Sequence, residues 1–279
     1  MSADRPRLAL VAFGVVVLVT LAWVGSTSSV AYDPYNPGDD GTSELRQQIE
    51  SEPGLEYETA AGYDGLEPDG TVAITAPSDD TDETDVATAD DAAASAETFV
   101  RDGGTLVVVA DSPEANAVLS SVGAEARLDG QVLRDDRHHY RGPAQPIATD
   151  VADHALTADV DRLGLNHATA VEPNGATVLA NSSEFSYLVD DPDATLGEDE
   201  RPSSHPVATV EDVGDGTVIV VGDSALATNE MLDHEDNARL LTNASGDADR
   251  VVVVSSDADG PPPLSELHSA VLDRVNVLR

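Results

Sequence analysis

The sequence predicts an α/β fold: a doubly wound, mostly parallel sheet with a β-rich insertion, preceded by one transmembrane helix. The unbroken β-branched run 217–221 and the similar run 105–109 indicate the sheet, because such runs suit strands that are buried on both faces of a parallel sheet. Each run is followed by a polar break and then by a helical pattern, which is the order of α/β units. The third observation is an uncharged apolar stretch of 18 residues from 8 to 25, long enough to span a bilayer.

Residues 1–25 are expected to form a short cytoplasmic segment and the membrane anchor. Arg5 and Arg7 precede the apolar stretch, and the next basic residue is Arg46. The positive-inside rule therefore places the N-terminus in the cytoplasm and the domain outside the cell, as a single-pass protein of the cell membrane. The alternative is a signal peptide that is cut after Ala31, since residues 29–31 are small, as at a cleavage site.

The first half of the domain is expected to alternate helices and strands. Residues 26–42 form a linker with a short first strand at 30–32, and the extracytoplasmic domain occupies 43–279. Glycine, proline and capping residues mark the ends of the elements in this part. We expect a helix that Thr42 or Ser43 caps and that ends before Pro53, strands at 55–59, 71–76 and 105–109, and helices at 89–101 and 114–121.

The section from about 124 to 210 has a different pattern. Short strand-like pieces separated by Gly, Pro and Asp replace the alternation, which predicts a β-rich section with no assigned pairing. These pieces lie at 131–133, 146–149, 176–180, 185–188 and 205–210. The chain then returns to the α/β pattern, with strands at 217–221 and 250–254, a helix that begins at Asp236 or Asn237, and an amphipathic C-terminal helix at 264–279.

The composition is strongly acidic. The net charge is −39, from 53 acidic and 14 basic residues, and every basic residue is Arg. Such a surface repels itself in dilute salt, and molar salt screens the repulsion, so the composition is typical of haloarchaeal proteins. Nucleic acid is excluded as a partner because it is a polyanion. Without Cys, the chain has no disulfide, thiolate metal site or cysteine nucleophile.

Three stretches resemble a known family. They are 35–43, 99–109, and the segment that runs from Gly222-Asp223-Ser224 through Asn229 to Arg239. Together they resemble a haloarchaeal, membrane-anchored family known as domain of unknown function 4350. The resemblance implies a flavodoxin-like sheet that is similar to the gliding-motility auxiliary domains of ABC-type transport systems and to class I glutamine amidotransferases. It also implies protein partners in a membrane assembly.

No catalytic or metal site is expected. Amidotransferase chemistry requires a Cys, and Ser112 and Ser224 lack the Gly-x-Ser-x-Gly elbow of a serine nucleophile. His138 and His139 are adjacent, so in a strand they point to opposite faces and cannot hold one ion together. Residues 233–236 lack the His-Glu-x-x-His spacing. We therefore expect no metal and no cofactor.

Polar residues follow several of the expected strands. Parallel strands end at one edge of the sheet, where α/β proteins bind ligands. The candidate ligand-binding residues are Asn36, Ser78, Asp111, Ser112, Asp223, Ser224 and Asn229. Helix N-termini at this edge favour an anionic or polar ligand, although the same residues could simply cap the helices that follow them.

The sequence thus predicts a non-catalytic, membrane-anchored component that binds a ligand or a protein partner. The alternative is a degenerate hydrolase that uses Asp and His at the carboxyl edge of the sheet.

Overall fold

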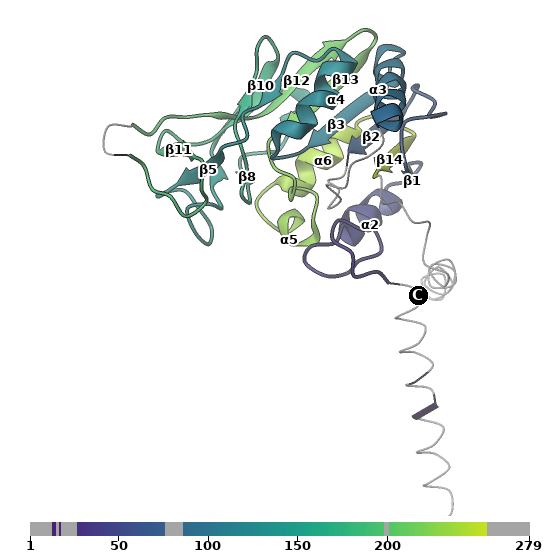
Figure 1. Cartoon of the computed structure of the whole chain (residues 1–279). Helices are drawn as coiled ribbons and strands as arrows, with labels where there is room; N and C mark the ends of the chain where they lie inside the picture. Colours follow the sequence, from purple (N-terminus) through teal and green to yellow (C-terminus); the bar gives the residue numbers. More distant parts are fainter. Residues whose placement is uncertain (1–12, 15–16, 18–26, 76–85, 198–200, 256–279) are drawn as a thin grey trace, which may run out of the picture.

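The protein is built around one eight-stranded sheet. The computed structural model describes residues 13–14, 17, 27–75, 86–197 and 201–255 (Figure 1). From one edge to the other, the strands of the sheet are β1 (Glu56–Ala60), β14 (Arg250–Val254), β2 (Thr71–Thr75), β3 (Thr105–Val109), β13 (Gly216–Val221), β12 (Pro206–Val213), β10 (Thr177–Asn181) and β7 (Asp150–Val151).

The sheet is mixed, so the doubly wound, mostly parallel sheet that we predicted is wrong. Strands β1, β14, β2, β3 and β13 are parallel to one another, whereas β12, β10 and β7 join by antiparallel pairings. The reason lies in Gly214 and Asp215, the two residues between β12 and β13. Gly214 has a φ of 63°, and a two-residue turn of this kind joins only antiparallel strands. The flavodoxin-like and amidotransferase-like arrangement is therefore not supported.

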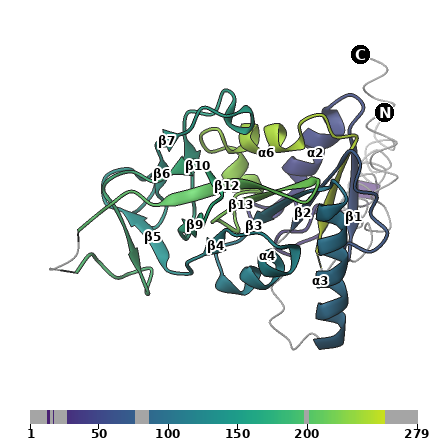
Figure 2. The ribbon, with the colours of Figure 1, turned by 90° about the horizontal axis from the view of Figure 1, so that it is seen from above.

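Helices cover both faces of the sheet (Figure 2). Helices α2 (Ser43–Ser51) and α6 (Asn237–Ser245) pack on the face that carries Val107 and Ile219. Helices α3 (Val86–Arg101) and α4 (Asn116–Val122) pack on the other face, which carries Leu106 and Val218. Alternate residues of the β-branched strands therefore fill two separate cores, which explains why these strands are apolar on both sides.

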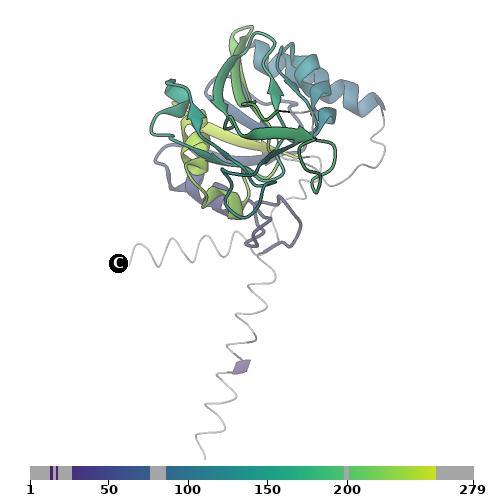
Figure 3. The ribbon, with the colours of Figure 1, turned by 90° about the vertical axis from the view of Figure 1, so that its left-hand side faces the viewer.

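Three small two-stranded sheets accompany the large sheet, and one of them lies at the end of the molecule beyond its antiparallel strands. They pair β5 (Val132–Asp135) with β11 (Ser186–Val189), β4 (Arg127–Leu128) with β9 (Val171–Glu172), and β6 (Ile147–Ala148) with β8 (Leu163–Gly164). Figure 3 turns this end of the molecule toward the viewer. The remaining short elements are η1 (Pro113–Ala115), η2 (Ala155–Thr157) and α5 (Asn229–Leu232).

Several expectations for the two ends of the chain need correction. The segment 30–32 is a turn rather than a first strand, and Tyr32 takes a φ of 59°, which is incompatible with a strand. Among the described residues, no helix is both long and apolar enough to cross a bilayer. This finding contradicts the predicted transmembrane helix and the membrane localisation derived from it. Nearly all of segment 8–25, and the whole predicted helix at 264–279, lie outside the described residues.

Candidate functional site

The candidate site lies at the carboxyl ends of β3 and β13. These neighbouring parallel strands end in register, with Val109 opposite Val221. The chain that follows β3 forms α4 on one face of the sheet, and the chain that follows β13 forms α6 on the other face. In α/β proteins, ligands bind where the connections of neighbouring strands leave to opposite faces of the sheet. We call this place the β3/β13 crevice.

Asp111 and Ser224 meet across the crevice. The Ser224 hydroxyl donates to Asp111 Oδ2 at 2.8 Å. Ser224 is buried, whereas Asp111 is half-buried. The serine hydroxyl donates to a carboxylate, so the pair lacks the histidine that usually activates a serine nucleophile.

Asp223, which follows the end of β13, is completely buried. Its Oδ1 accepts the backbone N–H of Ala225 at 2.8 Å, and its Oδ2 accepts that of Asn166 at 2.7 Å. Burial raises the pKa of this carboxyl to about 7, an effect that the two N–H donors oppose and that nearby Asp111 reinforces. Asp223 thus ties the end of β13 to the β8–β9 loop, and it changes protonation near neutral pH.

The loop between β5 and β6, residues 136–146, reaches toward the same end of the sheet. The Tyr140 ring lies 4.3 Å from the His234 ring, centroid to centroid, and the Tyr140 hydroxyl donates to Met231 Sδ at 3.3 Å. Burial raises the pKa of Tyr140 to about 12, and the carboxylates of Glu230 and Asp223 add to the rise. Arg141 forms an ion pair with Glu230. The loop is therefore fastened to α5 beside the crevice.

Asn229 and Asn36 hold the N-terminal loop against α5. The Asn229 side chain accepts the Glu44 N–H at 2.8 Å and donates to the Asn36 carbonyl at 3.1 Å. It also donates to the Gly38 carbonyl at 2.6 Å. Asn36 bridges its own loop, donating to the Val30 carbonyl at 2.8 Å. Both amides are buried, so their contacts serve the fold.

The structure brings together Asp111, Asp223 and Ser224, and it places Ser112 beside them as a cap. Ser112 Oγ accepts the Glu114 N–H at 3.5 Å at the start of η1. Ser78 lies outside the described residues. In the described part of the chain, no group of three His, Cys, Asp or Glu side chains could hold a metal ion.

Sequence reasoning missed Tyr140 and Asn166 and assigned His234 only to a polar loop. Tyr140 and Asn166 come from segments far from β3 and β13 in the chain, in the 136–146 loop and the β8–β9 loop. His234 lies between α5 and α6, where it contacts Tyr140. The sequence did offer one signal: Asn166 and His167 are adjacent residues of types that are enriched in the left-handed backbone region. In the structure, His167 takes this conformation, with a φ of 55°.

A cavity of about 540 Å³ lies at the opposite, amino end of the strands. Its walls include Thr105, Thr217, His154, Asn243 and Asp247. His154 Nδ1 already accepts the Leu156 N–H at 3.1 Å, and the Asn243 amide donates to the carbonyls of Leu156 and Ala158 at 3.1 and 2.8 Å. These polar groups serve the η2–α6 contact, so the cavity is a weaker candidate than the crevice.

The fold and the crevice define a mixed-sheet α/β domain with polar side chains gathered at the carboxyl ends of two parallel strands. The chain belongs to the family described as a domain of unknown function, DUF4350, which matches residues 34–244. The family part of our expectation is thus confirmed. No curated protein matches the sequence.

Among solved structures, the mmIFT52 N-terminal domain is similar over 72% of this chain and 87% of that chain, with a TM-score of 0.51 and 11% identity. This likeness concerns the fold alone. The β-galactosidase from Bacillus circulans sp. alkalophilus is similar over 54% of this chain and 20% of its own (TM-score 0.33, 18% identity). The polyextremophilic β-galactosidase from the Antarctic haloarchaeon Halorubrum lacusprofundi is similar over 64% of this chain and 23% of its own (TM-score 0.33, 15% identity). Neither enzyme bears on the function of this chain.

Proposed function

We propose that this domain is a non-catalytic binding domain and that the β3/β13 crevice receives its ligand or protein partner. The observation that carries the proposal is the departure of the chain to α4 after β3 and to α6 after β13, on opposite faces of the sheet. In α/β proteins such a divergence marks a common ligand-binding place, and Asp111 and Ser224 lie there.

The side chains of the crevice favour an occupant that donates hydrogen bonds. Asp111 Oδ1 accepts no hydrogen bond among the described residues, and Asp111 is half-buried rather than enclosed. An anionic occupant, which helix N-termini would favour, fits poorly, because α5 has only four residues and the Ala225 N–H is already bonded to Asp223. We therefore propose a neutral or cationic donor, such as an amide, hydroxyl or amine group.

A degenerate hydrolase is the alternative, and the contacts support it less. Nucleophilic serines usually donate to a histidine base, whereas the hydroxyl of Ser224 donates to the carboxylate of Asp111. The His234 ring is packed against Tyr140. Binding requires neither group to be rearranged, which is why we prefer it.

Site-specific photocrosslinking tests the location of the site. The chain has no Cys, so a single introduced Cys carries a crosslinker at one position only. We choose His167→Cys, exposed beside the crevice, and Asp247→Cys, exposed at the amino-end cavity. Labelled full-length protein is irradiated in extract of the source cells at molar KCl, and intact-mass analysis detects adducts of small molecules and of proteins alike.

We expect a discrete adduct at position 167 that Asp111→Asn reduces and Asp215→Asn does not. Asp215 is exposed in the β12–β13 turn, at the far end of the same strand, so it matches the change in charge without touching the crevice. Adducts at 247 alone, or equal adducts at both positions, would move the site away from the crevice.

We further propose that the chain works in molar salt, as its resemblance to haloarchaeal proteins implies. The support is the net charge of −39, since screening lowers the repulsion among unpaired acids more in the folded state than in the expanded one. The melting temperature of the full chain should rise from dilute buffer to 2–3 M KCl, at salt concentrations where the Debye length is at most about 3 Å. A melting temperature that does not respond to salt would contradict this proposal.

A further inference from the structure

The segment from Arg134 to Arg141 differs in charge from the rest of the chain. Its eight residues, Arg-Asp-Asp-Arg-His-His-Tyr-Arg, contain three of the 14 basic residues and two of the seven histidines. The segment covers the end of β5 and the start of the 136–146 loop, on the small β5–β11 sheet beyond the antiparallel strands (Figure 1). Concentrated positive charge on so acidic a protein calls for a physical explanation.

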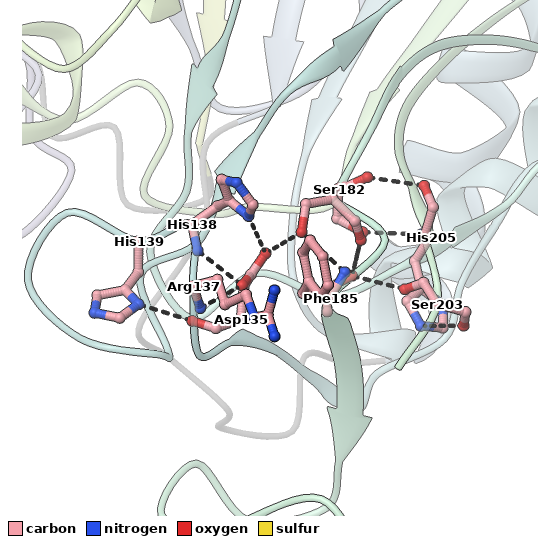
Figure 4. A network of polar contacts seen from close by, with 11 residues as sticks. Asp135, Arg137, His138, His139, Ser182, Phe185, Ser203 and His205 are labelled. Carbon is pink, nitrogen blue, oxygen red and sulfur yellow. Dashed lines mark hydrogen bonds and ion pairs between the residues drawn. The ribbon is translucent and has the colours of Figure 1, made fainter. Parts of the chain in front are cut away.

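Asp135 fixes the backbone of this loop. The Asp135 side chain is fully buried, and its Oδ1 accepts the N–H groups of Arg137 and His138 at 2.7 and 2.8 Å. The Ser183 hydroxyl donates to Oδ2, and the Asp135 carbonyl oxygen lies 2.8 Å from His139 Nδ1. As Figure 4 shows, Asp135 is the centre from which these side chains spread. Its carboxylate is therefore occupied in positioning Arg137 and His138.

Phe185 provides a platform for both basic side chains. The Arg137 guanidinium carbon lies 4.0 Å from the centre of the Phe185 ring, and the His138 ring stacks on the same ring at 5.7 Å with 22° between the planes. The backbone N–H of Phe185 donates to Ser183 Oγ at 3.0 Å. Because Ser183 also donates to Asp135, the platform and the loop are locked together (Figure 4).

Arg137 has a fixed position but no acidic partner. Its side chain is exposed, and within the described ranges no carboxylate lies within 4.0 Å of it. The neighbouring acid, Asp136, accepts the Tyr187 hydroxyl at 3.1 Å. Five other described arginines, by contrast, pair with glutamates. The guanidinium of Arg137 is thus exposed, lies over the Phe185 ring and has no acidic partner in the described part of the chain.

We propose that Arg137 and His138, supported by Phe185, form a binding site for a small oxyanion group, a phosphate or a carboxylate. A planar guanidinium that is held on an aromatic ring presents paired N–H donors, which match the two oxygens of such groups. His138 stacks on the same ring with 42% of its side chain exposed. Its Nδ1 is buried and faces Asp135 Oδ2 at 3.7 Å, so Nε2 is the ring nitrogen left for a ligand. This site is separate from the β3/β13 crevice. It takes an anionic ligand, whereas the crevice takes a neutral or cationic one.

Fluorine NMR can test the site directly, because the chain has only three phenylalanines. Full-length protein is labelled with 4-fluorophenylalanine, and the Phe185 signal is assigned from its loss in Phe185→Leu. Potassium phosphate, and separately potassium acetate, replaces KCl at a constant potassium concentration. We expect the Phe185 signal to shift saturably, while the signal of Phe99, buried between α3 and the sheet, stays in place.

Two variants separate specific binding from a general loss of charge. Arg137→Gln should raise the apparent Kd about tenfold, the ratio expected for the loss of a charge-assisted pair. Arg239→Gln removes an exposed arginine of α6 and should leave the Kd unchanged. An unmoved Phe99 signal in each variant shows that it is folded.

A saturable shift with phosphate alone would assign a phosphate ligand, and a shift with both salts would extend the class to carboxylates. A Phe185 signal that moves with neither salt would overturn the proposal. A shift that persists unchanged in Arg137→Gln would overturn it as well, because the ligand would then not be held by the guanidinium.

Discussion

The β3/β13 crevice and the β5–β11 sheet use buried acids in the same way but surround them differently. Asp223 and Asp135 are both fully buried, and each accepts two backbone N–H groups. Around Asp223, the polar side chains of Asn229 and Ser224 are bonded within the chain. Beside Asp135, the guanidinium of Arg137 stays exposed and unpaired with any acid in the described part of the chain.

The difference shows what a polar residue after a strand signifies. Buried polar groups must find partners, so most residues in such positions close loops rather than bind ligands. The better mark of a binding site is a group whose position is fixed while its hydrogen bonding is incomplete. By that criterion, the group available to a ligand is Asp111 Oδ1 in the crevice. On the β5–β11 sheet, it is the guanidinium of Arg137.

The largest expected effect on stability comes from removing a buried side chain that makes several hydrogen bonds within the chain. Asn229→Ala deletes the bonds to the Glu44 N–H and to the carbonyls of Asn36 and Gly38, and it leaves those backbone groups without partners. We expect the free energy of unfolding to fall by about 3 kcal/mol. Chemical denaturation in molar KCl measures the change.

Ser112→Ala is the matched control for that variant. Ser112 also caps a helical turn, but its bond to the Glu114 N–H is exposed and 3.5 Å long, so we expect a loss below about 0.5 kcal/mol. Equal losses for Asn229→Ala and Ser112→Ala would show that the bonds around the crevice stabilise the fold no more than a surface cap does.

A smaller, pH-dependent effect is expected at Asp223. Its pKa in the folded protein, about 7, lies above its ordinary value of 3.8, so the folded chain binds the proton more tightly than the unfolded chain does. Protonation therefore stabilises the fold: stability falls as pH rises toward 7, and the cost of burying the charge is complete above that pH. Between pH 8 and pH 6, Asp223 should add about 1 kcal/mol of stability.

Asp223→Asn removes this titration. The loss of stability that it causes should therefore grow as the pH is lowered from 8 to 6, whereas Asp215→Asn, an exposed substitution, should show no such trend. Denaturation midpoints of the three proteins across this range provide the measurement. A constant difference between wild type and Asp223→Asn would mean that Asp223 does not take up a proton in the folded protein over this range.

Local pattern was sufficient for the parallel strands. The runs that became β3 and β13 are short, apolar and rich in Val, and alternate residues fill the two cores, so their burial could be predicted from composition and length alone. The order in which Asp111 and Asp223 follow these strands is also a property of the sequence. Their placement at one end required only that the two strands be parallel.

The pairing of the strands between Ala124 and Val213 was decided by tertiary structure. Several of these strands have two residues, too few for a periodic signal, and their partners lie far away in the chain, as with β5 and β11. One local signal was available and was not used: the glycine turn at 214–215, which makes β12 antiparallel to β13.

What the sequence by itself determined is the acidic composition, the family, and the parallel strands with the aspartates that follow them. Each depends on residues near one another in the chain or on the sum of all residues. The tertiary structure alone decided that Tyr140 and Asn166 reach the crevice, that Ser224 donates to Asp111, and that Phe185 supports Arg137. Such contacts join segments tens of residues apart, and their positions depend on how the whole core packs, which no local pattern encodes.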